Sequence, residues 1–228
     1  MDVSALFDQL LQSGRDLVTK GQDMIEQKLD IPDSGSQRDA AWSSMGKGAA
    51  AAGVAALLLG TRAGRGLTGL ALKLGSLGAI GGLAYKTFQD WQAKQGGAPI
   101  DAGEPVTALS GPPLNQRSFA LLRAMLAACK ADGHIDEAEQ AKLDAYLQKL
   151  NLDPDALHFV KNELSKPLSV KEVAAGADSP AAAAEIYLTS LLAINIDSPA
   201  EKAYLEELAR ELKLSPDLVS DLLDQAKA

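Results

Sequence analysis

The residues best suited to chemistry are acids in two short stretches of the C-terminal half, "KADGHIDEAE" (130–139) and "INIDSPAE" (194–201). Carboxylate oxygens are the ligands that calcium and similar hard cations take in proteins. We therefore treat these acids as candidate ligands for a divalent, calcium-like cation. The candidates are Asp132, Asp136, Glu139, Asp197 and Glu201.

The first stretch matches only half of an EF-hand loop. With Gly133 at loop position 6, Asp132, Asp136 and Glu139 fall on positions 5, 9 and 12, as the EF-hand pattern requires. Positions 1 and 3, however, fall on Ala128 and Lys130, inside the run "LLRAMLAACKA", which is typical of continuous helix. A complete EF-hand is therefore excluded.

A helix cap accounts for the same residues without a metal. Asp136 could be an N-cap residue with Glu139 as its N3 partner, although this motif prefers Ser or Thr at the cap. In the second stretch, Ser198 would be the cap and Glu201 its partner. Both interpretations stay open at this point.

A weak internal repeat relates the two stretches. Residues 135–157 align with residues 196–219 when the second copy is given one extra residue. Each copy then holds an acidic corner, a helix, an "LxL" connection and a helix that starts with proline. A metal site depends on the two corners meeting across a pseudo-two-fold axis.

No other pattern in the sequence predicts catalysis. His134 and His158 have no partner pattern, and no glycine loop follows a strand, as phosphate binding requires. Cys129 lies in an apolar helical run, where a small buried hydrophobe is expected rather than a nucleophile. We expect a protein that is not an enzyme. Its acidic C-terminal part also argues against binding nucleic acid.

Helices must position these residues. Aromatic residues make up only 4% of the chain, and no run alternates with the period of two that predicts strands. The predicted fold class is all-α. Cap signals, mostly Ser-Pro pairs, divide the C-terminal part into seven helices. The predicted ranges are 117–131, 136–150, 154–164, 169–176, 180–194, 199–212 and 215–226.

The remaining chain divides into segments of different composition. Residues 1–30 predict an amphipathic helix that packs on another part of the chain or self-associates, and 31–46 predict a linker. The polar face of this helix is net acidic, which disfavours binding to a membrane surface. Residues 47–94 are apolar and glycine-rich. Residues 95–116 predict a Pro/Gly-rich tether before the domain at 117–228.

The glycine-rich segment predicts a membrane anchor. The stretch Leu67–Tyr85 is long enough to span the hydrocarbon core and contains one charge, Lys73. Small residues recur every four positions, as at Gly78 and Gly82, which lets helices approach closely. Aromatic residues and lysines after the span would mark the membrane interface. The alternative is a glycine-rich helical hairpin buried within the protein or its oligomer.

Taken together, these segments resemble a known family. The run "GKGAAAAGVAALLLGTRAGRGL…LGSLGAIGGLAYKTFQDWQ", followed by "KADGHIDEAE" and "IYLTSLLAINIDSPAEKAYLEELARELKL", is similar to the YebE-type inner-membrane proteins. The C-terminal part of that family resembles the tellurite-resistance TerB domain. The resemblance implies an all-α, seven-helix domain with divalent-cation sites at the repeated corners. Asn195 stands where relatives tend to carry aspartate, which implies a weaker site.

The resemblance also implies a class of function. It indicates a membrane-anchored adaptor or sensor at the bacterial inner membrane, with its C-terminal domain in the cytoplasm, acting in envelope or metal stress. Protein partners, or self-association through the glycine-rich segment, would follow from this role. The alternative is a soluble or peripheral oligomeric scaffold with a buried glycine-rich hairpin and no metal role.

Overall fold

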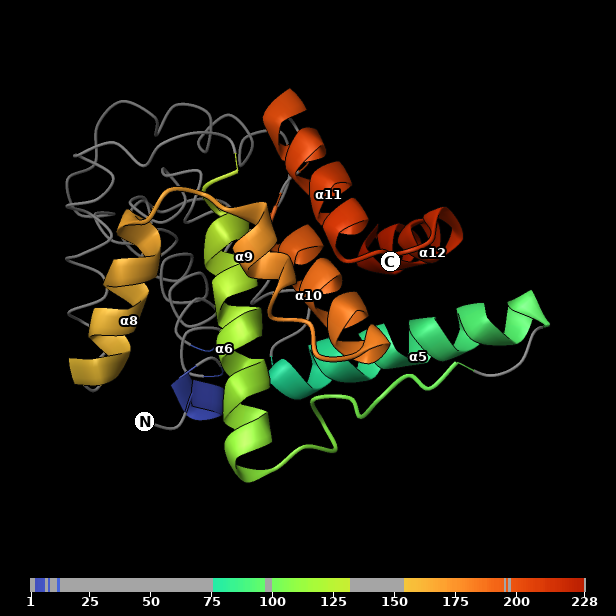
Figure 1. Cartoon of the computed structure of the whole chain (residues 1–228), viewed down its shortest axis with the longest axis horizontal. Helices are drawn as coiled ribbons and strands as arrows, with labels where there is room; N and C mark the ends of the chain where they lie inside the picture. The colour runs from blue at the N-terminus through green and yellow to red at the C-terminus, as the bar shows by residue number, and fades with distance from the viewer. Residues whose placement is uncertain are drawn as a thin grey trace, which may run out of the picture.

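The regular elements are α-helices throughout the part of the chain that the structure describes (Figure 1). The structure is a computed structural model and describes residues 3–6, 8, 12, 76–96, 100–131, 154–194, 196 and 198–227. The all-α prediction is confirmed for these residues. The helices are α5 (Leu77–Gln95), α6 (Gly111–Ala128), α8 (Pro154–Ser165), α9 (Val170–Ala174), α10 (Pro180–Ala193), α11 (Pro199–Glu211) and α12 (Pro216–Lys227).

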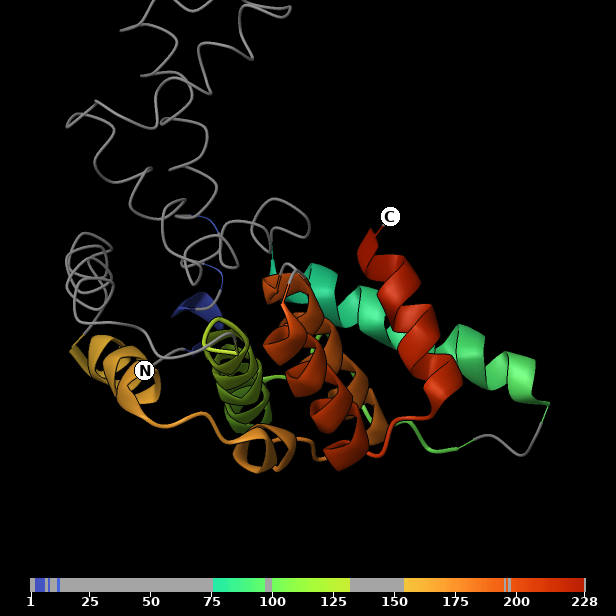
Figure 2. The same ribbon diagram turned by 90° about the horizontal axis from the view of Figure 1, so that it is seen from above.

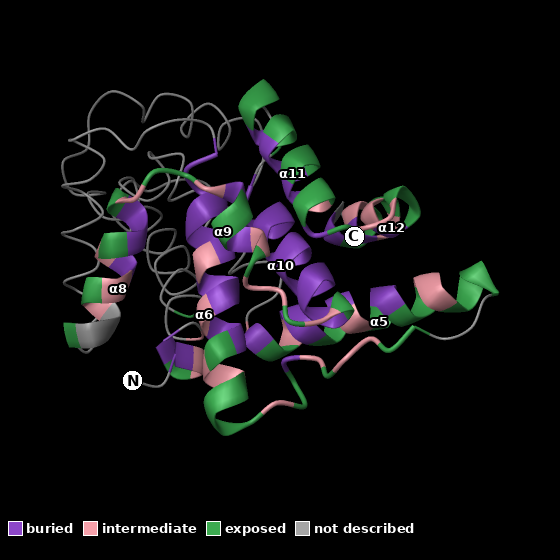
Figure 3. Cartoon of the chain, in the orientation of Figure 1, coloured by how far each residue is buried: buried purple, intermediate pink, exposed green. Residues whose placement is uncertain are grey.

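The centre of the fold is the pair formed by α6 and α10, which lie side by side and make the most extensive helix–helix contact described (Figure 1). Every residue of α10 from Ala181 to Ala193 is buried, so this helix is covered on all sides (Figure 3). A helix that is apolar all round is expected in a core rather than at a surface. α10 is therefore the element around which the others are placed.

The other helices pack around this pair. α8 contacts α6, and α9 contacts both α6 and α11. At the end of the molecule opposite α8, α5 packs against α10 and α12 (Figure 2). The C-terminal helices α11 and α12 both contact α10, so each of them covers part of the central helix.

Serine caps confirm four of the predicted helix starts. The Oγ atoms of Ser169, Ser179, Ser198 and Ser215 each accept a hydrogen bond from a backbone N–H three residues further on, at 3.2–3.4 Å. Proline follows three of these serines, at a position where its missing N–H leaves no bond unmade. Each cap satisfies an N–H group that the start of a helix leaves without a partner.

The stretch predicted as a Pro/Gly-rich tether, 95–116, is largely part of the packed structure. α6 begins at Gly111 rather than at residue 117, and its first turn contains both prolines of "GPP". Proline is tolerated in the first turn of a helix, so these residues start an element instead of breaking one. We call residues 100–110 the strap, because they cross the core with Val106 only 2% exposed.

The predicted membrane span Leu67–Tyr85 ends in a packed helix. α5 contains its last part, and the buried face of α5, which includes Ile80, Ala84 and Phe88, lies against the core. These residues recur four positions apart with exposed residues between them, which is the pattern of an amphipathic helix. In the described ranges, the structure contains no helix with both the length and the apolarity to cross a membrane. Residues 47–75 of the predicted segment lie outside those ranges.

The aromatic and lysine residues predicted to mark a membrane interface make contacts within the fold. The rings of Phe88 and Trp91 pack together with centroids 5.5 Å apart. Lys94 Nζ lies 2.9 Å from Asp221 Oδ2 on α12, which ties the end of α5 to the C-terminal helix. The interfacial-belt prediction has no support from these contacts.

Close packing on α5 occurs at one glycine and not along the predicted four-residue stripe. A Cβ atom at Gly81 would lie 2.2 Å from Val106 Cγ1 of the strap, closer than real Cβ contacts. A Cβ atom at Gly82 would meet nothing within 4 Å, and one at Gly78 would meet its nearest neighbour at 3.9 Å. Gly81 is therefore the position where the strap packs most closely against α5.

The start of the predicted 1–30 helix packs on the rest of the chain, as one of its predicted placements requires. Val3 and Leu6 are buried in the main core. Asp8 Oδ1 accepts a hydrogen bond of 2.7 Å from Leu77 N, the first residue of α5. The N-terminus of the chain therefore helps to cap a helix almost seventy residues away.

Candidate functional site

Of the predicted metal ligands, only Glu201 lies among the described residues. The carboxylate of Glu201 forms a capping box with Ser198: its Oε2 accepts from Ser198 N at 2.9 Å, while Ser198 Oγ accepts from Glu201 N at 3.2 Å. The cap interpretation of the second corner is thus confirmed. The other four candidates, which lie outside the described ranges, are Asp132, Asp136, Glu139 and Asp197.

The cation prediction consequently stays a prediction. Within the described ranges, no three His, Cys, Asp or Glu side chains are grouped so that they could hold a metal ion. Glu201 is buried, and one of its oxygens is engaged in the cap. A cation that used Glu201 would have to share this carboxylate with the start of α11.

Cys129 lies at the C-terminal end of α6, as a buried residue of the main hydrophobic core. Its placement agrees with the prediction of a small buried hydrophobe. We assign it no chemistry.

The structure brings together a buried charge cluster that the sequence analysis did not single out. Arg117 of α6 is 2% exposed and Glu185 of α10 is fully buried, with Arg117 Nη1 2.5 Å from Glu185 Oε2. Asp178 pairs with the other terminal nitrogen of Arg117 from the surface side. The side chain of Asp178 is 49% exposed, so the cluster extends from the core to the protein surface. Buried charges of this kind are stable only when paired and hydrogen-bonded.

This cluster holds the strap in place. Glu185 Oε1 accepts from Val106 N at 2.7 Å, and a neighbouring strap carbonyl, Ala102 O, accepts from Ala181 N at 2.8 Å. Burial raises the pKa of the Glu185 carboxyl, while the Val106 N–H and the Arg117 guanidinium oppose that rise. The cluster therefore fixes the strap to α6 and α10 through hydrogen bonds and ion pairs.

A second charge cluster ties α6 to the end of α8. Arg123 Nε lies 3.0 Å from Glu163 Oε2, and Lys166 Nζ lies 2.7 Å from Glu163 Oε1. Lys130 Nζ donates to the backbone oxygens of Glu163 and Lys166 at 2.6 and 2.8 Å, which caps the C-terminus of α8. Burial lowers the pKa of Lys130, against the attraction of Glu163. The hollow beside this cluster holds only about 10 Å³, too little for a ligand.

Two larger hollows lie on the C-terminal helices and are mainly apolar. The first, which we call the helix-pair groove, lies between α11 and α12 and has a volume of about 460 Å³. Its apolar lining is formed by Tyr187, Ile196, Leu205, Leu214, Val219 and Leu223.

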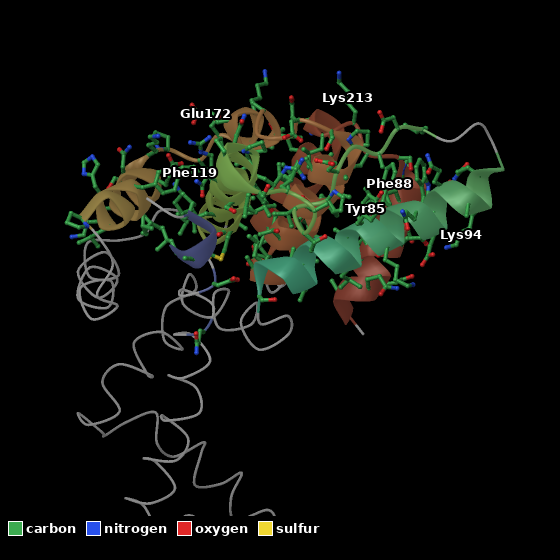
Figure 4. All side chains as sticks on the ribbon, turned by 90° about the horizontal axis from the view of Figure 1, so that it is seen from below. Tyr85, Phe88, Lys94, Phe119, Glu172 and Lys213 are labelled. Atoms are coloured by element: carbon green, nitrogen blue, oxygen red, sulfur yellow. The ribbon has the colours of Figure 1, made fainter. Side chains whose placement is uncertain are left out.

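The second hollow, which we call the α5 groove, has a volume of about 570 Å³ and lies between α5, the α9–α10 connection and the α11–α12 turn. Figure 4 labels two of the residues that border it, Phe88 on α5 and Lys213 in the turn. The remaining large apolar side chains of its lining are Trp91, Ile100, Leu212, Leu214 and Leu218.

Exposed large hydrophobic side chains mark these hollows. Among the described residues there are three: Ile100 at 52% exposure, Ile196 at 40% and Leu168 at 37%. Ile100 borders the α5 groove and Ile196 the helix-pair groove. Leu168 borders the small hollow beside Glu163. Grooves with exposed apolar rims are typical of binding surfaces.

The fold and these surfaces define a helical domain with grooves suited to binding. A family model described as "Protein of unknown function (DUF533)" matches residues 44–226, so the chain belongs to this family. Its membership agrees with the TerB-like part of the resemblance. The narrower YebE-type assignment stays a prediction.

A curated relative is similar over part of the chain. The "Uncharacterized protein in ampR 5'region" of Yersinia enterocolitica is 27% identical over 122 residues, which cover 54% of this chain and 87% of the relative. No solved structure matches the chain.

The residues missed by the sequence analysis carry a recognisable signal. Glu185 is the only acid in the apolar run "AAAAEIYLTSLLA", and Arg117 begins the apolar run of α6. A charged residue on an otherwise apolar helix requires a partner. The sequence does not show that these two residues, 68 positions apart, are partners.

Proposed function

We propose that this chain is a non-enzymatic adaptor whose helical domain docks a helix of a partner protein in the helix-pair groove. The groove itself is the observation that supports this most strongly. It combines an apolar floor from α10, α11 and α12 with an exposed isoleucine, Ile196, at its edge. An amphipathic helix places its apolar face in a groove of this kind.

The charges beside the groove suggest the pattern of the partner helix. Lys202, Glu206 and Arg210 border it along α11 with a spacing of four residues, so they follow one another on the same side of the helix. Their charges alternate as plus, minus, plus. A partner helix with an acid, a base and an acid at the same spacing would match them, which favours specificity more than affinity.

Membrane attachment is a separate part of the proposal. Residues 47–75 would associate the adaptor with the bacterial inner membrane, with the domain on the cytoplasmic side. The packing of α5 against the core favours the alternative, in which the chain is a peripheral scaffold. Carbonate extraction of membranes separates the two: the anchored form stays in the pellet, and the scaffold is released.

The docking proposal is tested by site-specific photo-crosslinking in cells. A benzoylphenylalanine at Ile196 is expected to give discrete adducts with a helical segment of another protein, identified by mass spectrometry. The matched control is the same probe at Leu168, which has similar exposure but lies beside the small hollow. Equal adduct patterns at the two positions, or no adduct at Ile196, would overturn the docking proposal.

The cation part of the proposal rests on the acidic corners alone. Calcium titrated into the full chain is expected to raise its melting temperature, because an ion that binds only the folded state stabilises it. The double variant Asp136→Asn/Asp197→Asn should lose that rise. No rise with the unaltered chain at millimolar calcium would remove the cation from the function.

A further inference from the structure

We propose, on the basis of the membrane attachment put forward above, that the chain attaches to the bilayer from one face only. The segment 9–75 would leave the helical domain and return to it on the same side of the membrane, without crossing it. The observation that carries this topology is the hydrogen bond between Asp8 and Leu77, which joins the two ends of that segment.

The end that precedes the segment is fixed in the domain. Val3 and Leu6 are 0% and 4% exposed and belong to the main core. Val3 N donates to Asn115 Oδ1 of α6 at 3.3 Å, and Asp8 Oδ1 accepts from Leu77 N at 2.7 Å. The N-terminal residues are therefore tied both to α6 and to the start of α5.

The end that follows the segment is fixed by the start of α5. Leu77 is 4% exposed, and Ser76 Oγ accepts a hydrogen bond from Ala79 N at 3.2 Å, which caps the helix. The hydrocarbon core of a bilayer is about 30 Å thick. Because a hydrogen bond joins Asp8 to Leu77, these residues cannot lie on opposite sides of it. The segment between them therefore crosses an even number of times or not at all.

The packing of α5 also shortens the predicted span. Because α5 takes Leu77 and the residues after it into the core, only residues 67–76 of the stretch Leu67–Tyr85 precede the helix. As a helix, these ten residues would reach about 15 Å, half of the hydrocarbon thickness. The 13 residues of Gly48–Gly60 would reach about 20 Å. Neither apolar run is long enough to cross the membrane alone.

Two arginines disfavour a single crossing made from both runs. Arg62 and Arg65 lie near the middle of residues 48–75, so a helix across the bilayer would place both near its centre. Charged side chains are costly at that depth, whereas arginine pairs well with phosphate at the head groups. The two apolar runs therefore suit insertion into one leaflet, with the arginines at the head groups, better than a crossing.

The topology is tested by cysteine labelling of the full chain in a Cys129→Ala background. Single cysteines are placed at exposed positions before and after the segment, Gln12→Cys and Gln89→Cys, and between the two arginines, Ala63→Cys. A membrane-impermeant maleimide is applied to spheroplasts and to inverted membrane vesicles. All three cysteines are expected to react in the same preparation, the inverted vesicles.

The outcomes separate this topology from membrane attachment itself. If Gln12→Cys and Gln89→Cys react in opposite preparations, the chain crosses the membrane and the topology is wrong, while attachment stands. If only Ala63→Cys reacts from the opposite face, the segment crosses twice, which also overturns attachment from one face. Release of the chain by carbonate would overturn both the attachment and the topology.

The contact between the N-terminal residues and the domain is tested separately in the detergent-solubilised full chain. Val3→Asp places a charge in the core and is expected to lower the melting temperature by several degrees. Ala5→Asp, at an exposed position of the same turn, is the matched control and should change it little. Equal melting temperatures for the two variants would overturn the topology, because the two ends of the segment would then not be held together.

Discussion

At the scale of single residues, Lys213 is held in a backbone conformation that disfavours its side chain. Its φ is +56°, in the left-handed region, where it ends α11. Lys213 N donates to Arg210 O at 3.1 Å and Leu214 N donates to Ala209 O at 3.0 Å. These two bonds form the Schellman motif, whose left-handed position is usually glycine.

Lys213→Gly is therefore expected to stabilise the protein by about 1 kcal/mol, because glycine removes the steric cost of the left-handed conformation. The free energy of unfolding is measured by urea titration. The matched control is Lys202→Gly, at an exposed position inside α11, which should destabilise by about 1 kcal/mol. A loss of stability in Lys213→Gly would contradict the assignment of strain.

The buried pair of Arg117 and Glu185 predicts a second residue-scale effect. Arg117→Met leaves Glu185 buried without its main partner and is expected to destabilise by about 3–5 kcal/mol at neutral pH. Arg123→Met is the control, since the buried Glu163 keeps Lys166 as a partner and the Arg123 side chain is itself 33% exposed. Arg123→Met is expected to lower the free energy of unfolding by about 1 kcal/mol. Urea titration of both variants tests the difference.

The loss in Arg117→Met should also depend on pH. Burial already raises the pKa of Glu185 in the folded chain, and removing the guanidinium raises it further. Between the unfolded and the raised folded pKa, the folded state binds more protons than the unfolded state, so stability rises as pH falls. The difference in free energy of unfolding between the unaltered chain and Arg117→Met should therefore be smaller at pH 5 than at pH 7.5. Glu185→Gln in the same variant should remove that dependence, and an unchanged difference would refute it.

At the scale of elements, the contact between α5 and the strap depends on Gly81. Gly81→Ala would place a methyl group against Val106 and is expected to destabilise by about 1–3 kcal/mol. Gly82→Ala is the matched control, because its side chain would meet open space. It should stabilise by up to about 1 kcal/mol through the helix propensity of alanine.

Thermal unfolding of the two variants gives opposite shifts if the strap is placed as described. Val106→Ala, combined with Gly81→Ala, should recover part of the loss by making room for the new methyl group. Similar melting temperatures for the two single alanine variants would contradict the close approach of strap and helix.

The elements differ in how well their sequences predict them. Helix starts were predictable where Ser and Pro act locally, as at Ser179 and Ser198, because a cap involves residues only three positions apart. The role of α5 was not predictable, because a glycine-rich apolar sequence fits both a membrane-spanning helix and a helix packed against the strap. Only the distant Val106 distinguishes them.

The candidate sites show the same limit. The capping role of Glu201 was one of two readings of a local pattern, and the structure confirms it. The ion pair of Arg117 and Glu185 forms only where helices that are far apart in the sequence meet, and the same is true of both grooves. No periodicity or spacing within one segment contains that information.

At the scale of the whole molecule, the described segments form one packed unit. The N-terminal residues Val3 and Leu6, helix α5 and the C-terminal helices all contribute to the same core. The strap supplies the N–H group that binds Glu185. The domain boundary at residue 117, predicted from composition, therefore cuts through contacts that stabilise α10.

We expect the fragment 116–228 to lack a cooperative thermal transition, because removing α5 and the strap exposes the apolar surface of α10 and leaves Glu185 without the Val106 N–H. The fragment 76–228 should unfold cooperatively, at a lower temperature than the full chain, which also has the Asp8 cap. Far-ultraviolet circular dichroism follows each transition. The near-ultraviolet tyrosine signal reports packing around the buried Tyr187 and Tyr204, which are 2% and 3% exposed. If 116–228 melted cooperatively at the temperature of the full chain, α5 and the strap would not contribute to the stability of the fold. The cation titration could then use the shorter fragment.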